Sequence, residues 1–206
     1  MADSTPTRRR LPAAERRRQV IAAVLELARE ASPEGITTQA IANRVGLTHG
    51  ALFRHFPDKE SLWVEVFAWV QKELGTVLDA AFASKGDALA RLERVFLEHV
   101  GLVAHFPGAP RILFHELQRP VDSPFHERVR NIIGSYRRQL LDLLGEAKRA
   151  GQLSPTLDET TAAMLFIGAV QGLVVQSTLF RSEAEMVDAA RRIFPLLLDG
   201  FRGCSQ

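Results

Sequence analysis

Apolar residues recur every three to four positions along most of the chain, with polar residues between them. In the first such segment Val20, Val24 and Ala28 fall on one face, which is the spacing of an amphipathic helix. Pro12 suits the first turn of that helix, and the Ser-Pro-Glu-Gly stretch at residues 32–35 ends it.

The same periodicity continues to the C-terminus, interrupted by short Gly, Pro and Ser stretches, and no segment has the pattern of a strand. We expect further helices near residues 38–45, 48–55, 58–84, 87–105, 110–117, 124–150, 158–180 and 183–201. Asp58 is placed to cap the long helix expected at residues 58–84. The Ser-Glu-Ala-Glu stretch at residues 182–185 has the pattern of a capping box, and Pro195 should kink or divide the last helix. The sequence predicts an all-α fold of about nine helices.

Composition narrows the class of protein. The 206 residues are 46% hydrophobic and 24% charged, which is typical of a soluble globular protein. A single cysteine, Cys204, can complete neither a structural disulfide nor a thiolate zinc site, which favours the reducing cytoplasm. No apolar segment follows the N-terminal arginines, so we expect no secretory signal.

The net charge of +2 hides an uneven distribution. Residues 1–60 hold ten Lys and Arg against seven Asp and Glu, and six of those ten are arginines at residues 8–10 and 16–18. A basic end on a nearly neutral body indicates a polyanionic partner there. A solvated tail is the alternative.

Residues 36–59 have the pattern of a helix-turn-helix. Thr37 or Thr38 can cap its first helix and Thr48 its second, while Gly46 can take the positive φ that a tight turn between them needs. Small Ala42 allows close approach of the helices. The space between them is filled by Ile41, Val45, Leu47 and Leu52.

Residues 48–56 (THGALFRHF) and 58–62 (DKESL) resemble the recognition helix and the start of the fourth helix of the TetR family of bacterial transcriptional regulators. The match extends back through residues 36–38 and the first helix. This resemblance implies a DNA-binding head in residues 1–60, and an effector-binding body of about six helices in residues 61–206 that forms a homodimer through its last two helices. Position 53 departs from the family, because it holds Phe where members usually carry Tyr.

The candidate DNA contacts follow from a recognition helix that presents its first turn to the major groove. His49 is the candidate base contact, Thr48 can bind a phosphate, and Gly50 lets the backbone approach the DNA. Phe53 packs on sugar or a thymine methyl, or belongs to the core. By resemblance, His55 and Lys59 clamp phosphates. The full set is Thr38, Thr48, His49, Gly50, Phe53, Arg54, His55 and Lys59.

Aromatic and histidine side chains in the middle helices suggest a largely apolar cavity for a small effector. The candidate lining residues are Trp69, Phe96, His99, Phe114, His115, Tyr136 and Phe166. The alternative for each of them taken alone is a place in the core or on the surface. A metal site built from scattered His and Glu residues is an alternative, although their spacing matches no compact zinc signature.

From Ala162 to Val175 the only polar residue is Gln171, so this segment should be buried on all sides. The run is short for a membrane span, and we expect no membrane partner. Glycines four residues apart make a flat strip against which another helix can pack closely. That helix could belong to the same chain, but the resemblance to the TetR family favours a helix of the twin subunit. The candidate dimer contacts are Gly168, Gly172, Val175, Ile193 and Leu197.

Together these features predict a regulator, most simply a repressor released from a palindromic operator in double-stranded DNA by a small apolar effector. No glycine-rich phosphate loop, GxSxG or HExxH motif is present, so we expect neither an enzyme nor a cofactor. A helical metal-binding protein or enzyme that does not bind DNA is the alternative.

Overall fold

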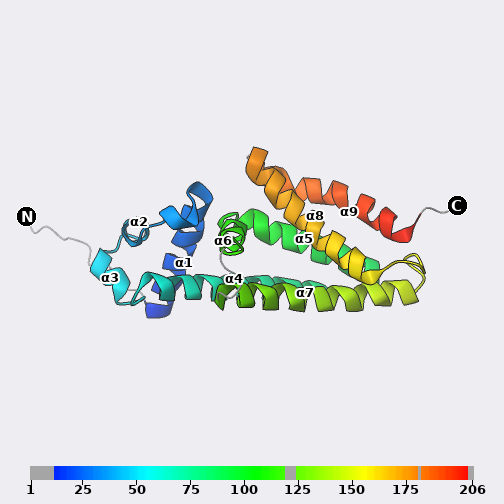
Figure 1. The fold of residues 1–206 in the computed structure, drawn as a ribbon, viewed down its shortest axis with the longest axis horizontal. Helices are drawn as coiled ribbons and strands as arrows, with labels where there is room; N and C mark the ends of the chain where they lie inside the picture. The colour runs from blue at the N-terminus through cyan, green and yellow to red at the C-terminus, as the bar shows by residue number, and fades with distance from the viewer. Residues whose placement is uncertain (1–11, 119–123, 181, 204–206) are drawn as a thin grey trace, which may run out of the picture.

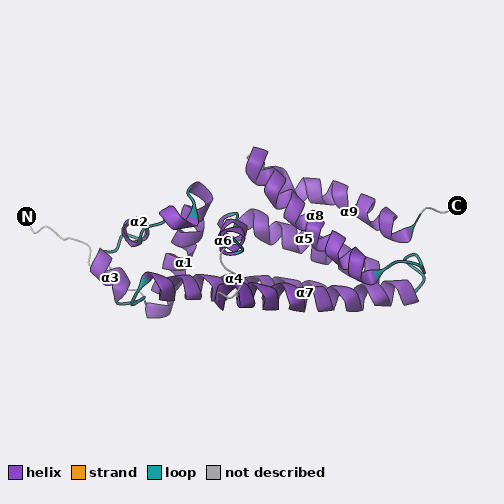
Figure 2. Cartoon of the chain, viewed as in Figure 1, coloured by secondary structure: helices purple, strands orange, loops and turns teal. Residues whose placement is uncertain are grey.

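The computed structural model describes residues 12–118, 124–180 and 182–203, and all regular structure within them is helical (Figure 1, Figure 2). The α-helices there are α1 (Ala13–Glu30), α2 (Thr38–Arg44), α3 (His49–Phe53), α4 (Lys59–Phe82), α5 (Ala88–His105), α6 (Gly108–Glu116), α7 (Pro124–Arg149), α8 (Glu159–Phe180) and α9 (Met186–Arg202). Short 3-10 turns, η1 (Pro33–Gly35) and η2 (Glu183–Glu185), precede α2 and α9. The predicted all-α fold is confirmed. Cys204 and the arginines at residues 8–10 lie outside the described residues.

Helices α1, α2 and α3 form a small head at one end of the molecule (Figure 1). Thr37 caps α2 by accepting a hydrogen bond from the amide of Ala40 at 3.1 Å, and Thr48 caps α3 by accepting from Ala51 at 3.2 Å. Gly46 lies in the turn between these helices with a φ of 65°, which side chains with a Cβ rarely adopt. The helix-turn-helix is therefore present as predicted.

Helix α4 belongs to both the head and the body. Asp58 caps it by accepting from the Ser61 amide at 2.7 Å, and the Ser61 hydroxyl accepts from the Asp58 amide at 3.3 Å. The first turns of α4 bury Leu62 and Val66 in the head core, whereas its later turns bury Leu78 in the body core. A movement of α4 in the body would therefore reach the head.

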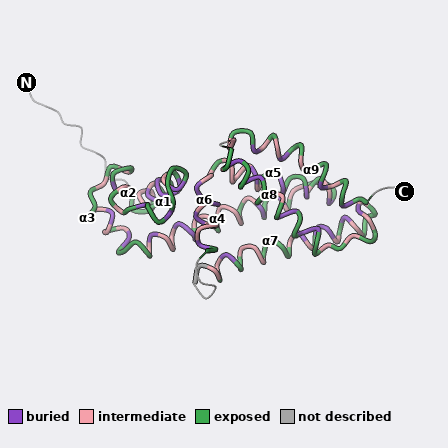
Figure 3. Tube along the Cα trace, turned by 45° about the horizontal axis from the view of Figure 1, so that its top comes forward, coloured by how far each residue is buried: buried purple, intermediate pink, exposed green. Residues whose placement is uncertain are grey.

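The body is a bundle built around α5, which packs against α4, α7, α8 and α9. Helices α8 and α9 lie on one side of α5, and α4 and α7 on the other (Figure 1). Phe96 of α5 is fully buried, with its ring centroid 5.2 Å from that of Phe166 and 5.6 Å from that of Phe194. Buried positions follow the inward faces of these helices (Figure 3).

The start of the last helix differs from the prediction. Ser182 makes no side-chain cap hydrogen bond, and its ψ of 34° is not the extended conformation of a helix cap. The predicted capping box is wrong, because residues 183–185 form η2 and α9 begins only at Met186. Pro195 lies inside α9 and does not divide it.

Candidate functional site

The first turn of α3 and the start of α2 form one exposed polar surface. The Nε2 atom of His49 lies 2.9 Å from the hydroxyl oxygen of Thr38, within hydrogen-bond distance, and the His49 ring meets Phe53 edge-on with centroids 4.7 Å apart. Gly50 is exposed, and a Cβ added there would meet nothing within 4 Å. Nothing within the chain therefore requires glycine at this position. Thr38, Thr48, His49, Gly50 and Phe53 lie close together on this surface.

A basic groove continues from this surface between α1 and α3. Arg17 of α1 donates to the carbonyl oxygen of His55 at 3.1 Å and to Glu65 at 2.9 Å, so it ties α1 to the end of α3 and to α4. The groove offers four basic side chains to a polyanion. It is lined by Ala13, Ala14, Arg16, Arg17, Leu47, Ala51, Arg54 and His55.

Lys59 is exposed at the first position of α4 and lines a different groove, between the head and the body. Three carboxylates line the same groove, which suits a lysine in the positively polarised first turn of a helix. They belong to Glu34, Glu60 and Glu116.

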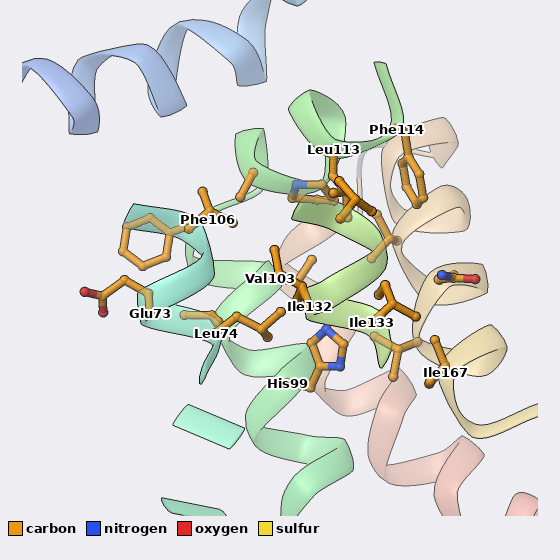
Figure 4. Close-up of a pocket in the computed structure, with 18 of the residues that line it drawn as sticks. Glu73, Leu74, His99, Val103, Phe106, Leu113, Phe114, Ile132, Ile133 and Ile167 are labelled. Atoms are coloured by element: carbon orange, nitrogen blue, oxygen red, sulfur yellow. The ribbon is translucent and has the colours of Figure 1, made fainter. Parts of the chain in front are cut away.

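A cavity of about 90 Å³ lies in the body among α4, α5, α6, α7 and α8 (Figure 4). Its lining is apolar except for Glu73, His99 and Gln171. The remaining lining residues are Trp69, Val70, Leu74, Leu102, Val103, Phe106, Ala109, Pro110, Leu113, Phe114, Val129, Ile132, Ile133, Ile167, Val170 and Val174. Most of these were missed by sequence reasoning, because a single aliphatic residue on a helix face gives no sign of which neighbour it meets.

The candidate effector contacts separate into three groups. Trp69, His99 and Phe114 line the cavity, and Tyr136 lies behind it against His99. Phe96 and Phe166 do not line it, because their rings pack on each other in the core, as described above. His115 also lies elsewhere, with its Nε2 atom 3.8 Å from a carboxylate oxygen of Glu34 in the head.

His99 and Tyr136 form a polar pair in this apolar region. The Nδ1 atom of His99 lies 3.2 Å from the Tyr136 hydroxyl oxygen. Burial lowers the pKa of His99 to about 4 and raises the pKa of Tyr136, because each charged form would lose its hydration. Both side chains are therefore neutral at pH 7.

Helix α6 connects the cavity to the head. Ala109, Leu113 and Phe114 line the cavity, whereas Ile112 is buried in the head core. The first residue of α6 touches α1, since a Cβ added at Gly108 would lie 1.9 Å from the backbone carbonyl oxygen of Leu25. Arg111 strengthens this contact by donating to the carbonyl oxygen of Arg29.

One face of α8 is apolar but exposed, so the helix is not buried on all sides as expected. Gly168, Gly172 and Val175 lie on this face, and a Cβ added at either glycine would meet nothing within 4 Å. Ile193 and Leu197, in contrast, pack into the body's own core. The exposed large side chains of α8 are Met164, Leu165, Val175, Leu179 and Phe180.

The described residues bear on two alternatives to a soluble effector site, a metal site and a membrane-spanning helix. Within them, no group of three or more His, Cys, Asp or Glu side chains is arranged to hold a metal ion. Among the same residues, α8 is the one helix long and apolar enough to cross a membrane, and 39% of its apolar 18-residue stretch is buried. Such a helix is weak support for a membrane span, because core helices of bundles share its composition.

Comparison with known proteins identifies the family. The family of bacterial regulatory proteins named tetR matches residues 20–66, and the tetracyclin repressor-like C-terminal domain matches residues 120–194. A nucleoid occlusion factor SlmA from Klebsiella pneumoniae is 31% identical over 170 residues, covering 81% of this chain and 84% of that protein. SlmA from Marinomonas is 24% identical over 160 residues, covering 78% of this chain and 81% of that protein.

Solved structures share the fold. The ketosteroid transcriptional regulator KstR2 of Mycobacterium tuberculosis aligns with a TM-score of 0.79 at 19% identity, over 92% of this chain and 96% of that one. FadR from Bacillus subtilis, solved with stearoyl-CoA, aligns with a TM-score of 0.72 at 20% identity, over 89% of this chain and 98% of that one. The chain belongs to the TetR family and is a DNA-binding transcriptional regulator.

Proposed function

We propose that the protein is a cytoplasmic homodimeric repressor, released from a palindromic operator by a small, largely apolar effector bound in the body cavity. The observation that carries this proposal is the position of α6. One face of this helix lines the cavity while Ile112 and Gly108 hold it against the head.

In the head, the first turn of α3 is the part that enters the major groove. His49 is the base contact, held in place by Thr38 at 2.9 Å and by the Phe53 ring. Thr48 contacts a phosphate, and so do the basic side chains of the groove, Arg16, Arg17, Arg54 and His55. These contacts position the head without reading sequence. Lys59 remains a candidate phosphate contact from its exposed position at the start of α4.

In the body, the exposed face of α8 is the centre of the subunit interface. Its apolar side chains would be an unusual surface for a monomer, and Gly168 and Gly172 leave space for a helix of the twin subunit. A two-fold dimer presents two recognition helices to half-sites about one helical turn or a multiple apart, which requires an inverted repeat in the DNA.

The size of the cavity suggests how an effector would act. At about 90 Å³ it is smaller than the engineered cavity of about 150 Å³ that holds benzene in another protein. A larger effector must therefore displace a wall, and the α4 and α6 walls both continue into the head core. FadR from Bacillus subtilis was solved with stearoyl-CoA, which supports the proposal that a body of this fold can hold a ligand with a long acyl chain.

Selection of bound DNA from a random pool tests the DNA-binding half of the proposal. The purified dimer should enrich an inverted repeat, with an affinity that falls steeply as salt rises, because phosphate contacts release counterions. Failure to enrich any palindromic sequence at low salt would contradict the proposal that the protein binds a palindromic operator.

Titration tests the sensor half. Compounds that raise the thermal midpoint are titrated with and without the selected operator. Reciprocity requires a true effector to bind the operator complex more weakly, by the same factor by which it weakens DNA binding. A compound whose affinity is unchanged by saturating operator is not the effector.

A further inference from the structure

Among the cavity-lining side chains labelled in Figure 4, His99 carries the one polar group that points into the cavity. Of the three lining residues that are not apolar, Glu73 directs its carboxylate away from the cavity (Figure 4) and Gln171 is exposed on α8. The His99 ring instead points inward, between Val103, Ile132 and Ile133 (Figure 4). A ligand in this cavity thus meets hydrocarbon almost everywhere and an imidazole at one point.

Tyr136 determines which hydrogen-bonding role the imidazole offers. Within the described residues, the Nδ1 atom of His99 is the one hydrogen-bond partner of the buried Tyr136 hydroxyl. A buried hydroxyl hydrogen without an acceptor is costly, so the hydroxyl donates to Nδ1. A neutral imidazole carries one hydrogen, which is then on Nε2, the nitrogen left for the cavity. The cavity therefore contains a fixed hydrogen-bond donor.

The charge of the lining restricts the ligand further. No Lys or Arg is among the described residues that line the cavity, and the one ionisable acid there, Glu73, is negative when charged. An anionic group taken into this site would lose its hydration without gaining a counter-ion. In the free protein His99 is uncharged at neutral pH, because burial lowers its pKa to about 4, so an anion would have to protonate the ring before it gained a counter-ion.

We propose that the effector is an uncharged, mainly hydrocarbon molecule with one carbonyl or hydroxyl oxygen, and that this oxygen accepts a hydrogen bond from Nε2 of His99. His99 is the residue that determines specificity, and Tyr136 is a positioning residue that fixes its tautomer. This inference rests on the proposed effector site.

Four probes with the same carbon chain test the inference: octane, 2-octanone, 2-octanol and octanoate. Each is titrated against the full-length dimer by calorimetry and thermal denaturation at pH 7. We expect 2-octanone and 2-octanol to bind more tightly than octane by about 3- to 10-fold, which corresponds to one net hydrogen bond. Octanoate should bind most weakly.

Variants separate recognition from packing. His99→Leu combined with Tyr136→Phe removes the pair without leaving either polar group buried alone, so it should reduce the preference for 2-octanone over octane to about 1-fold while octane still binds. Tyr136→Phe alone frees Nδ1 to carry the hydrogen, so the preference for 2-octanone should fall more than that for 2-octanol. His105→Leu, at an exposed position of α5 outside the cavity lining, is the matched control and should keep the full preference.

The outcomes distinguish this inference from the sensor function. Tightest binding by octanoate, or an unchanged preference in the double variant, would overturn the ligand class while leaving an effector site in place. Absence of binding by all four probes would overturn the effector site itself, and this inference with it.

Discussion

Replacing Gly108 by alanine tests whether the contact between α6 and α1 transmits the state of the cavity to the head. An added Cβ would lie 1.9 Å from the carbonyl oxygen of Leu25 and 3.2 Å from the Cβ of Ala28. Side-chain Cβ atoms essentially never come closer than 3.0 Å to such atoms, so α6 and α1 must separate by about 1 Å, the difference between a 3.0 Å contact and the 1.9 Å one. The oxygen belongs to the backbone of a helix and cannot move aside alone.

Two effects of this separation can be estimated. Overpacking of a buried contact costs about 1–3 kcal/mol, which lowers the thermal midpoint by about 2–4 °C per kcal/mol in a chain of this size. The separation also shifts Ile112 in the head core and the Arg111 hydrogen bond to Arg29. If these contacts carry a coupling of about 1–3 kcal/mol, operator affinity should fall by about 5- to 150-fold.

The assay compares thermal denaturation and operator binding, by fluorescence anisotropy, for Gly108→Ala and a matched Gly101→Ala variant. A Cβ at Gly101, in α5, meets nothing within 4 Å, and alanine is favoured over glycine inside a helix by about 0.5–1 kcal/mol. The control should be as stable as the wild type or more so, with unchanged operator affinity. If Gly108→Ala also matched the wild type in both measurements, the proposed role of α6 would be refuted.

Four further predictions concern the head, the dimer and the buried histidine. His49→Ala should reduce the discrimination between bases at one operator position by about 1–3 kcal/mol of binding free energy, whereas Lys59→Ala should weaken binding to all sequences alike and flatten its salt dependence. If a binding-site selection showed that His49→Ala weakens all sequences alike, His49 would be a contact to the DNA backbone. Phe53→Tyr should tighten binding without altering sequence preference in the same selection, if the added hydroxyl reaches a phosphate. Gly172→Leu should give a folded monomer in sedimentation, because a Cβ added there meets nothing within 4 Å in the single chain. A stable dimer would place the interface elsewhere. Gly75→Leu in α4, where an added Cβ also meets nothing within 4 Å, is the control. The pKa of His99 is about 4 in the folded protein and about 6.5 in the unfolded chain. As pH falls, the unfolded chain therefore binds a proton that the folded protein does not. The free energy of unfolding should fall by about 2 kcal/mol between pH 7 and pH 5. Tyr136 faces His99 and stays protonated, whereas Glu73 lines the same cavity with its carboxylate directed away. Denaturant titrations of wild type and His99→Leu should differ by this amount, and equal losses in both proteins would contradict this assignment.

Features that depend on neighbouring residues could be predicted from the sequence. The caps at Thr37, Thr48 and Asp58 act within three residues of their own position, and Gly46 has the positive φ expected of its turn. For the same reason, the helix-turn-helix and the order of the helices were predicted with small boundary errors. The capping box at residues 182–185 failed because a 3-10 turn, which the local pattern did not distinguish, forms there.

Features that depend on contacts between distant segments were decided only by the tertiary structure. The sequence determined that aromatic and histidine side chains lie on the middle helices, but packing decided that Phe96 and Phe166 meet in the core while His99 faces the cavity. The contact of Gly108 with Leu25 likewise joins residues far apart in the chain. Helical periodicity specifies which face of a helix is apolar; which apolar neighbour that face meets depends on how the helices pack, and that packing produced the cavity and its connection to the head.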